Sequence, residues 1–376
     1  MQKMRNLNIL IKPASGRCNM HCTYCFYKDE MQSRETDDYG LMTLDTAYVL
    51  IDKAFELAEH VVFMFQGGEP TLRGLDFFRS FVSYAEKKGA ASFALQTNGY
   101  LLNSEWFQFF SEHHFLIGLS IDGPKVIHDE YRKDNSGRGT FERVFNTSRL
   151  LAESCVDFNA LVTVNGKTAE NAELVYSFLK RNGMRYQQYI PCIDPIDAER
   201  GSLPFSLSPE AYGHFLIELF RLYERDWRRG DYVSIRYFDN LVLFLAGFGT
   251  EECGMIGECS LSYAIEADGS VYPCDFYVID RYRLGNIADD SFAEIDRKRQ
   301  EIGFVEKSRE KDPGCLSCRY FPICRGGCRR YREGFLTGSM ERNHFCASYR
   351  MFFDECLPQL IQMAEKERSF RESKLQ

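Results

Sequence analysis

Residues 12–30, KPASGRCNMHCTYCFYKDE, place Cys18, Cys22 and Cys25 on one short stretch after the first predicted strand. A disulfide would leave one thiol over, and a structural zinc site needs four ligands. Three thiolates on one loop suit a four-iron cluster that leaves one iron open for chemistry. The alternative is three unrelated buried thiols, because free cysteine packs well as a small apolar residue.

The rest of the first half alternates strand-like and helix-like segments. The predicted strands are residues 6–13, 61–66, 93–99, 115–123, 157–164 and 184–191, and the predicted helices are 43–60, 76–89, 104–114, 140–154 and 169–183. Six such units predict an α/β fold with a parallel sheet and helices outside it. A doubly wound sheet and a partial barrel both fit, and both put functional loops at the carboxyl ends of the strands.

Beyond residue 190 the alternation stops. A connector rich in Pro, Gly and Ser is followed by a helix over about 209–229, a cysteine-dense section over 253–346 and a last helix over about 349–366. The cysteine-dense section is poor in long regular elements, so metal sites are expected to hold it together. The expected domains are 1–230 for the β/α repeats, 231–348 for the cysteine-rich section and 349–376 for a helix packing back on the repeats.

Composition narrows the class of protein. The 376 residues are 44% hydrophobic and 27% charged, with a net charge of −8, which argues against a nucleic-acid partner. No apolar run is long enough to span a membrane or act as a signal peptide, so a cytoplasmic location is expected. Thiols stay reduced in that compartment, so the 14 cysteines are better explained as metal ligands than as disulfides.

A second motif, FQGGEP, follows the predicted strand at residues 61–66. Gly67 and Gly68 allow the backbone to approach a ligand closely, and Glu69 is placed to accept from a ligand ammonium. A tight turn between strand and helix is the plainer interpretation.

Further along, LSIDGP offers Ser120 and Asp122 at the end of another predicted strand, and HDEYRKD offers Arg132. For each of these three residues a turn or a solvated face is the alternative.

The C-terminal section contributes eight cysteines: Cys253, Cys259, Cys274, Cys315, Cys318, Cys324, Cys328 and Cys346. Eight thiols make two complete sets of four, and the spacing alone does not show which four go together. Zinc is a real alternative, since C-x2-C is a common zinc half-site. Of the remaining cysteines, Cys155 and Cys356 are expected to be packing residues, and Cys192 has no assigned role.

The spacing C-x3-C-x2-C, with Tyr24 between the last two cysteines, resembles the radical S-adenosylmethionine superfamily, and the GGEP turn in the correct order strengthens the resemblance. It implies a partial (β/α)6 TIM-like barrel, a 4Fe–4S cluster on the first three cysteines, and S-adenosylmethionine bound with the help of Gln66, Gly67, Gly68 and Glu69. The section from Cys259 to Cys346 resembles the SPASM extension. It implies two auxiliary 4Fe–4S clusters, one on Cys253, Cys259, Cys274 and Cys328, the other on Cys315, Cys318, Cys324 and Cys346.

Asp275 follows Cys274 directly in the segment YPCDFY. An ordinary turn aspartate is the commoner case, but a carboxylate fixed beside a cluster ligand is placed to take a proton while the cluster takes an electron.

Segment by segment, the chain most resembles the anaerobic sulfatase-maturating enzymes, on motifs such as FQGGEPTL, LQTNG, GLSIDGPK, CGMIGEC, DGSVYPCDFYV and CRGGCRR. The resemblance implies oxidation of a Cys or Ser, in a Cys/Ser-x-Pro/Ala-x-Arg segment of an unfolded sulfatase, to Cα-formylglycine. A 5′-deoxyadenosyl radical would remove the Cβ hydrogen, and Asp275 would take the thiol or hydroxyl proton. The expected partners are that segment and an electron donor such as flavodoxin or ferredoxin, with the enzyme a monomer. The alternatives are another SPASM peptide modifier, such as a thioether-forming maturase, and a zinc-stapled binding protein.

Overall fold

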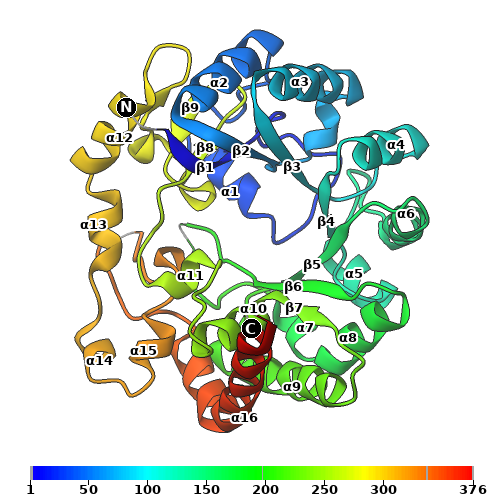
Figure 1. The fold of residues 1–376 in the computed structure, drawn as a ribbon, viewed down its shortest axis with the longest axis vertical. Helices are drawn as coiled ribbons and strands as arrows, with labels where there is room; N and C mark the ends of the chain where they lie inside the picture. Colours follow the sequence, from blue (N-terminus) through cyan, green and yellow to red (C-terminus); the bar gives the residue numbers. More distant parts are fainter. Residues whose placement is uncertain (1–2, 197, 336–337, 375–376) are drawn as a thin grey trace. The chain divides into compact units, whose positions relative to one another are not determined.

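The structure is a computed structural model that describes residues 3–196, 198–335 and 338–374. The chain forms two compact units, drawn in Figure 1. The first comprises Met1–Ile121, His128–Asn159 and Leu261–Phe304, and the second comprises Asp122–Ile127, Ala160–Ser260 and Val305–Gln376.

The first unit is built on strands in the order β10-β9-β8-β1-β2-β3-β4. Strands β1 (Met4–Ile11), β2 (Ala58–Phe65), β3 (Ala90–Thr97) and β4 (Leu116–Ser120) pair in parallel, and β8 (Tyr263–Ile265) is parallel to β1. Strands β9 (Ser270–Tyr272) and β10 (Gly285–Asn286) complete it in antiparallel pairing. The loops after the parallel strands therefore leave the sheet at one edge.

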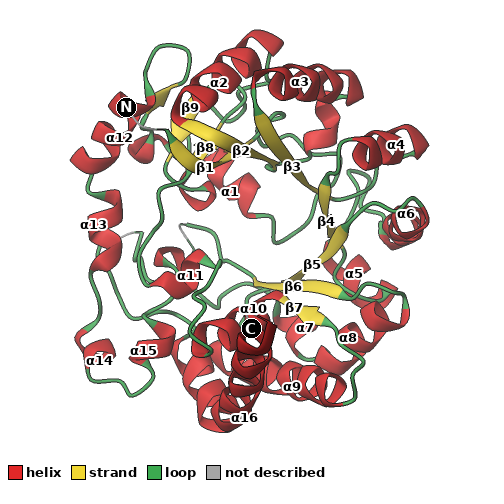
Figure 2. Ribbon diagram, viewed as in Figure 1, coloured by secondary structure: helices red, strands yellow, loops and turns green. Residues whose placement is uncertain are grey.

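Figure 2 shows helices α2, α3 and α4 beside strands β1, β2 and β3. The helices of this unit are α1 (Phe26–Gln32), α2 (Leu44–Leu57), α3 (Leu75–Lys88), α4 (Ser104–Glu112), α6 (Phe141–Glu153) and α12 (Phe292–Glu301), with 3-10 turns η1 (Pro70–Arg73), η2 (Asp275–Tyr277) and η3 (Asp280–Tyr282). Leu50, Ile51 and Ala54 share one face of α2 and are fully buried. A side chain at Gly89, which ends α3, would meet the Phe55 ring at 2.7 Å, so glycine lets the two helices approach.

Helix α2 begins close to the predicted position and ends earlier than expected. The hydroxyl of Thr43 accepts from the Thr46 amide at 3.1 Å, so Thr43 is the N-cap of the helix. The helix stops at Leu57 instead of His60, and β2 starts at once. His60 contacts Asn6 on β1 and Ser92 on β3 through hydrogen bonds of 3.2 and 2.9 Å. Pairing with both neighbouring strands thus overrides the helical tendency of residues 58–60.

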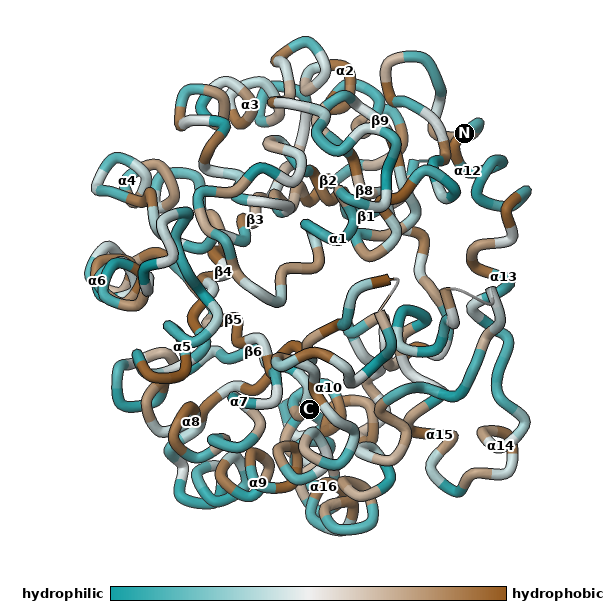
Figure 3. The backbone as a smooth tube through the Cα atoms, turned by 180° about the vertical axis from the view of Figure 1, so that it is seen from behind, coloured by the Kyte–Doolittle hydropathy of each residue, from teal (hydrophilic) through white to brown (hydrophobic). Residues whose placement is uncertain are grey.

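The second unit contains most of β5 (Phe158–Val164), with β6 (Tyr186–Pro191) and β7 (Ser234–Ile235) in parallel beside it. Its longer helices are α8 (Ala172–Arg181), α9 (Pro209–Arg228), α10 (Arg236–Leu245) and α16 (Cys346–Lys374). The short ones are α7 (Gly166–Ala169), α11 (Cys253–Ile256), α13 (Phe304–Arg309), α14 (Pro313–Leu316), α15 (Phe321–Cys324) and η4 (Arg329–Tyr331), while α5 (Lys125–Tyr131) contains a boundary between the units. In Figure 3 hydrophobic and hydrophilic colours alternate along α8 and α9, as amphipathic helices require.

The expected α/β class with parallel β/α repeats and a cysteine-rich C-terminal section is confirmed. Helix α16 is longer than the predicted 349–366, because it begins at Cys346 and continues through a charged segment rich in good helix formers. Cys356 is buried as expected, but the expectation for Cys155 is wrong. Cys155 is exposed just beyond α6, where its φ of 54° reverses the chain at the surface.

Candidate active site

The three-cysteine loop lies between β1 and α1, at the carboxyl edge of the parallel strands. Its thiols are half-buried, and the charges of Cys22 and Cys25 act on Cys18, so the three lie close together. Burial raises the pKa of the Cys18 thiol to about 12, so a bound cation would be needed to hold the thiolate form. Backbone hydrogen bonds from His21 to Lys133 (2.7 Å) and from Thr23 to Tyr131 (3.1 Å) fix the loop.

The turn formed by Gly67, Gly68 and Glu69, here called the GGE turn, packs directly against this loop. The Glu69 amide donates to the Arg17 carbonyl at 2.7 Å, and a Cβ at Gly68 would come within 2.2 Å of the same oxygen. Gly68 also has a φ of +49°, so both the conformation and the close approach require glycine. The turn that follows β2 and the cysteine loop that follows β1 therefore form one continuous backbone surface.

The Glu69 carboxylate is fully buried and already engaged by the protein. Its Oε1 accepts from the amide and hydroxyl of Thr71 (3.1 and 2.6 Å) and from the Thr97 hydroxyl (2.8 Å), and its Oε2 accepts from the Asn98 amide (2.8 Å). Burial raises the pKa of Glu69, and these donors oppose the rise. The side chain thus ties the turn to the end of β3 and has little capacity left for a ligand.

Asn98 was not singled out from the sequence, although it belongs to the quoted motif LQTNG. Its side-chain amide donates to Asn19 at 2.8 Å and lies 3.6 Å from the Cys18 sulfur. Tyr24 and Arg132 also lie at the loop, with the guanidinium 5.5 Å from the Tyr24 ring centre. The charge of Arg132 acts on Cys25, whose pKa is raised chiefly by burial.

The other two predicted residues have separate surroundings. Ser120 ends β4 and is half-buried. Asp122 belongs to the second compact unit, where its buried carboxylate accepts from the Thr163 amide at 2.9 Å. That contact explains Asp122 as a residue that fixes the chain after β4.

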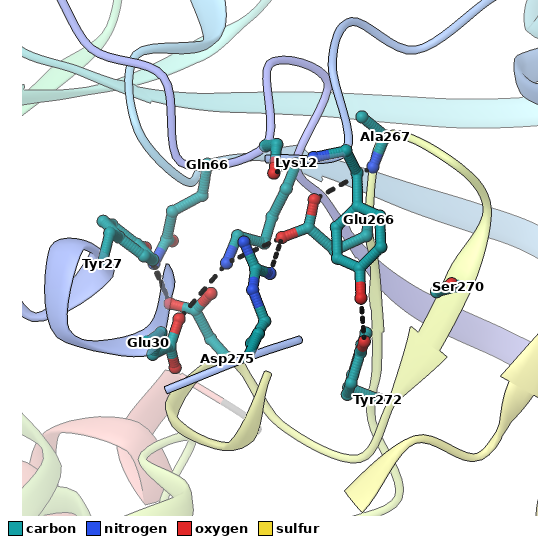
Figure 4. Close-up of polar contacts among 12 residues, drawn as sticks. Lys12, Tyr27, Glu30, Gln66, Glu266, Ala267, Ser270, Tyr272 and Asp275 are labelled. Atoms are coloured by element: carbon teal, nitrogen blue, oxygen red, sulfur yellow. Dashed lines mark hydrogen bonds and ion pairs between the residues drawn. The ribbon is translucent and has the colours of Figure 1, made fainter. Parts of the chain in front are cut away.

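Asp275 lies in a partly buried polar cluster drawn in Figure 4. Tyr27 donates to its Oδ2 at 2.7 Å, and Gln66 donates both to that oxygen (2.6 Å) and to the Tyr27 hydroxyl (2.6 Å). Among the described residues, Oδ1 of Asp275 has no hydrogen-bond partner. Both donors therefore hold one carboxylate oxygen and leave the other with its lone pairs available. Tyr27 lies shortly after Cys25, and Gln66 opens the GGE turn. The cluster therefore joins the three-cysteine loop, the GGE turn and the YPCDFY segment.

A layer of buried charges lies behind Asp275, and sequence reasoning missed it. Lys12 follows β1 and Glu266 follows β8, and the Lys12 ammonium is 3.3 Å from both Glu266 and Glu30 on α1. Arg34 contacts Glu266 at 2.7 Å. Figure 4 shows Lys12 directed at these carboxylates from the strand side.

The charges of this layer do not balance if every carboxyl is ionised. Burial opposes the charge of Lys12, but the carboxylates of Glu30, Glu266 and Asp275 raise its pKa. Burial likewise opposes the charge of Glu266, but Lys12 and Arg34 lower its pKa. Burial raises the pKa of both Glu30 and Asp275. Two cations thus face three carboxyls, and the protonated form is favoured on Glu30 and Asp275 rather than on Glu266.

The C-terminal cysteines fall into groups. In the second unit the charges of Cys253 and Cys259 act on Cys328, and separately those of Cys315, Cys318 and Cys346 act on Cys324. Cys274 belongs to the first unit, where it precedes Asp275.

In residues 3–196, 198–335 and 338–374 no group of His, Cys, Asp and Glu could hold a single metal ion. A four-iron cluster requires a more widely spaced set of ligands than a single ion, because each thiolate binds its own iron atom. All-thiol donor sets, with no carboxylate or imidazole required, fit such clusters.

Comparison with known families agrees with this chemistry. Residues 13–179 match the Radical SAM superfamily, and residues 253–319 match an iron–sulfur cluster-binding domain, SPASM. Fold and site together thus define a radical S-adenosylmethionine enzyme with an iron–sulfur extension.

Individual relatives are more specific. The cysteine-type anaerobic sulfatase-maturating enzyme of Clostridium novyi is 41% identical over 96% of this chain and 98% of its own. The serine-type enzyme of Bacteroides thetaiotaomicron is 30% identical over 94% and 90%. The solved structure of native anSMEcpe with bound AdoMet and Cp18Cys peptide is 40% identical, with a TM-score of 0.91 over 96% of this chain and 99% of that one. The chain belongs to the family of anaerobic sulfatase-maturating enzymes.

No helix among the described residues is both long and apolar enough to cross a membrane.

Proposed function

We propose that this protein oxidises a cysteine of an unfolded sulfatase segment to Cα-formylglycine. The observation that carries the proposal is the Asp275 cluster, in which Tyr27 and Gln66 hold Oδ2 and leave Oδ1 available to a substrate proton. Cysteine is proposed over serine because the cysteine-type relative is 41% identical and the serine-type relative 30%.

Each set of cysteines is proposed to hold one iron–sulfur cluster. Cys18, Cys22 and Cys25 would hold the first cluster, with Tyr24, the Gln66–Glu69 turn, Ser120, Asp122 and Arg132 serving S-adenosylmethionine. Cys253, Cys259, Cys274 and Cys328 would hold one auxiliary cluster, and Cys315, Cys318, Cys324 and Cys346 the other. The domain boundaries after residues 230 and 348, a cytoplasmic location, a monomeric state and a flavodoxin or ferredoxin donor stay predictions.

The proton balance follows from the residues of this chain. When bound, S-adenosylmethionine and the clusters supply the removal of one Cβ hydrogen atom and one electron from the substrate. Oδ1 of Asp275 takes the thiol proton, which completes the oxidation to a thioaldehyde, and water then replaces sulfur to give the aldehyde and hydrogen sulfide. The buried Lys12 ammonium faces the carboxyl groups of this layer and fixes their positions. Oδ1 of Asp275 is itself buried, which keeps bulk water away from the proton-accepting atom.

The test is an anaerobic reaction of the reconstituted protein with two peptides that differ only in Cys or Ser at the target position. Mass spectrometry should show the aldehyde in place of the side chain, formed faster from the Cys peptide. A thioether crosslink, or loss of two hydrogens with sulfur retained, would instead identify another SPASM peptide modifier. Equal rates with both peptides would remove the proposed preference alone.

A further inference from the structure

A row of aromatic rings runs through the second unit beside the auxiliary cysteines. Tyr331 contacts Phe345 with ring centres 5.2 Å apart, Phe345 contacts Tyr212 at 4.9 Å, Tyr212 contacts Tyr349 at 6.2 Å, and Tyr349 contacts Tyr237 at 6.4 Å. The tyrosine rings come from α9, α10, α16 and η4, and Phe345 lies just before α16, so packing of separate elements builds the row.

Different parts of the row adjoin different cysteine sets. The Tyr331 amide donates to the Cys328 carbonyl at 3.2 Å. Tyr349 is three residues beyond Cys346 on α16, which places both on one face of the helix. A Cβ at Gly327 would lie 3.9 Å from the Tyr349 ring, so this ring reaches the segment between Cys324 and Cys328. The charge of Cys324 acts on both Tyr349 and Tyr237.

The hydroxyl groups of the row differ in what they contact. The Tyr331 hydroxyl donates to the Pro191 carbonyl at 3.3 Å. For Tyr237 and Tyr349, by contrast, the part of the chain that the structure describes offers no hydrogen-bond partner to the hydroxyl. Phe345 belongs to the same row without any hydroxyl, so ring packing alone does not require tyrosine. Each of these two hydroxyls can therefore donate to an acceptor from outside the protein chain.

We propose that the hydroxyl groups of Tyr237 and Tyr349 tune the reduction potential of the auxiliary cluster on Cys315, Cys318, Cys324 and Cys346. The inference rests on the ligand set given under the proposed function. A cluster becomes more negative on reduction, and a nearby O–H dipole stabilises that reduced state, because hydrogen bonds to cluster sulfurs are among the factors that set the potential.

Two properties suit the tyrosines to this role. Burial raises the pKa of both phenols well above the usual value, so each keeps the proton it donates. Both rings are also held by packing, since α10 and α16 lie against each other and Tyr237 contacts Phe352 with ring centres 6.3 Å apart. The two phenol oxygens are thus held in place, and each hydroxyl hydrogen can turn toward an acceptor.

The test is an anaerobic redox titration, followed by electron paramagnetic resonance, of the reconstituted full chain and of Tyr349→Phe, Tyr237→Phe and the double variant. Each single change should move the midpoint potential of this one cluster to a more negative value, and the double variant should move it further. Tyr212→Phe is the matched control, because Tyr212 belongs to the same row and no cysteine acts on its phenol. It should leave every potential unchanged.

Unchanged potentials in Tyr349→Phe and Tyr237→Phe with full iron content would overturn the inference. If Tyr349→Phe loses iron because it follows the ligand Cys346 closely, Tyr237→Phe decides, since it lies on a different helix. Loss of iron in both would show a purely structural role and also overturn it. A wild-type chain with only about four iron atoms, one cluster's worth, would instead contradict the ligand assignment itself.

Discussion

At the scale of the residue, the two oxygens of Asp275 have different surroundings. Oδ2 accepts from Tyr27 and Gln66, which come from the segments after the first strand and after β2. Oδ1 has no partner among the described residues. The carboxylate is thus held in position by one oxygen while the other keeps the capacity to accept, which is the arrangement a proton acceptor needs.

Replacing Asp275 by Asn should separate radical formation from product formation. Asn keeps the shape but cannot take a proton at neutral pH. Formylglycine should form about 10²–10⁴-fold more slowly, the usual cost of losing a general base, while 5′-deoxyadenosine and iron content stay as in the wild type. Both products are measured in one reaction. Wild-type rate and ratio of both would mean that another group takes the proton.

The buried charges behind Asp275 make a prediction about stability. Above pH 8, where Glu30 is ionised, Lys12→Met leaves it without its ammonium partner, and removing one member of a buried ion pair costs about 3–5 kcal/mol in the free energy of unfolding. Adding Glu30→Gln should recover part of the loss, because the pair is then removed together. Anaerobic urea unfolding of the four chains of this cycle measures the coupling. A coupling of zero would show that Lys12 and Glu30 do not interact in the folded protein.

Glu30 also predicts a pH dependence. Burial raises its folded-state pKa to about 8 from an ordinary value of 4.5, so its proton stabilises the folded state fully below the ordinary value. That contribution is lost as the pH rises through the folded-state pKa. Wild-type thermal midpoints should therefore fall more steeply than those of Glu30→Gln as the pH approaches 8. Parallel curves for the two proteins would count against a shifted carboxyl at this position.

At the scale of the element, the site is made by loops that leave parallel strands at one edge. From the sequence alone, the cysteine loop, the GGE turn and Asp275 could be named as candidates, because each is marked by local spacing or by a neighbouring cysteine. No local pattern identifies Lys12, Glu30 and Glu266. Each belongs to an otherwise ordinary strand or helix end. Their meeting depends on β8 pairing with β1, and Tyr27 and Asp275 are 248 residues apart in the chain. Local patterns do not encode contacts of that range.

The cysteine loop makes the next prediction. Replacing Cys18, Cys22 and Cys25 together by Ala should abolish cleavage of S-adenosylmethionine, because these thiols are the proposed ligands of the open-iron cluster. The auxiliary clusters should remain, since their cysteines lie in other segments. Iron content and 5′-deoxyadenosine are measured on the same preparation. Any 5′-deoxyadenosine above background from the triple variant would refute the assignment of this loop.

At the scale of the whole molecule, two parts of the chain have different roles. The β/α repeats position the cysteine loop and the GGE turn, and the cysteine-rich section contributes thiols in numbers that apolar packing does not explain. The reconstituted protein should hold about 12 iron atoms per chain, from three four-iron clusters, with negligible zinc. Elemental analysis after anaerobic reconstitution gives the count. About four iron atoms with stoichiometric zinc would show that the C-terminal section is a zinc scaffold instead.

The most direct test of the proposed function is the fate of a sulfatase-derived peptide with Cys at the target position, incubated anaerobically with the reconstituted protein, S-adenosylmethionine and a reductant. Mass spectrometry of the peptide and quantification of 5′-deoxyadenosine in the same sample give both sides of the reaction. The proposed function predicts an aldehyde at the target residue and one 5′-deoxyadenosine for each aldehyde formed. An unmodified peptide accompanied by 5′-deoxyadenosine, or a crosslinked peptide that retains its sulfur, would contradict it.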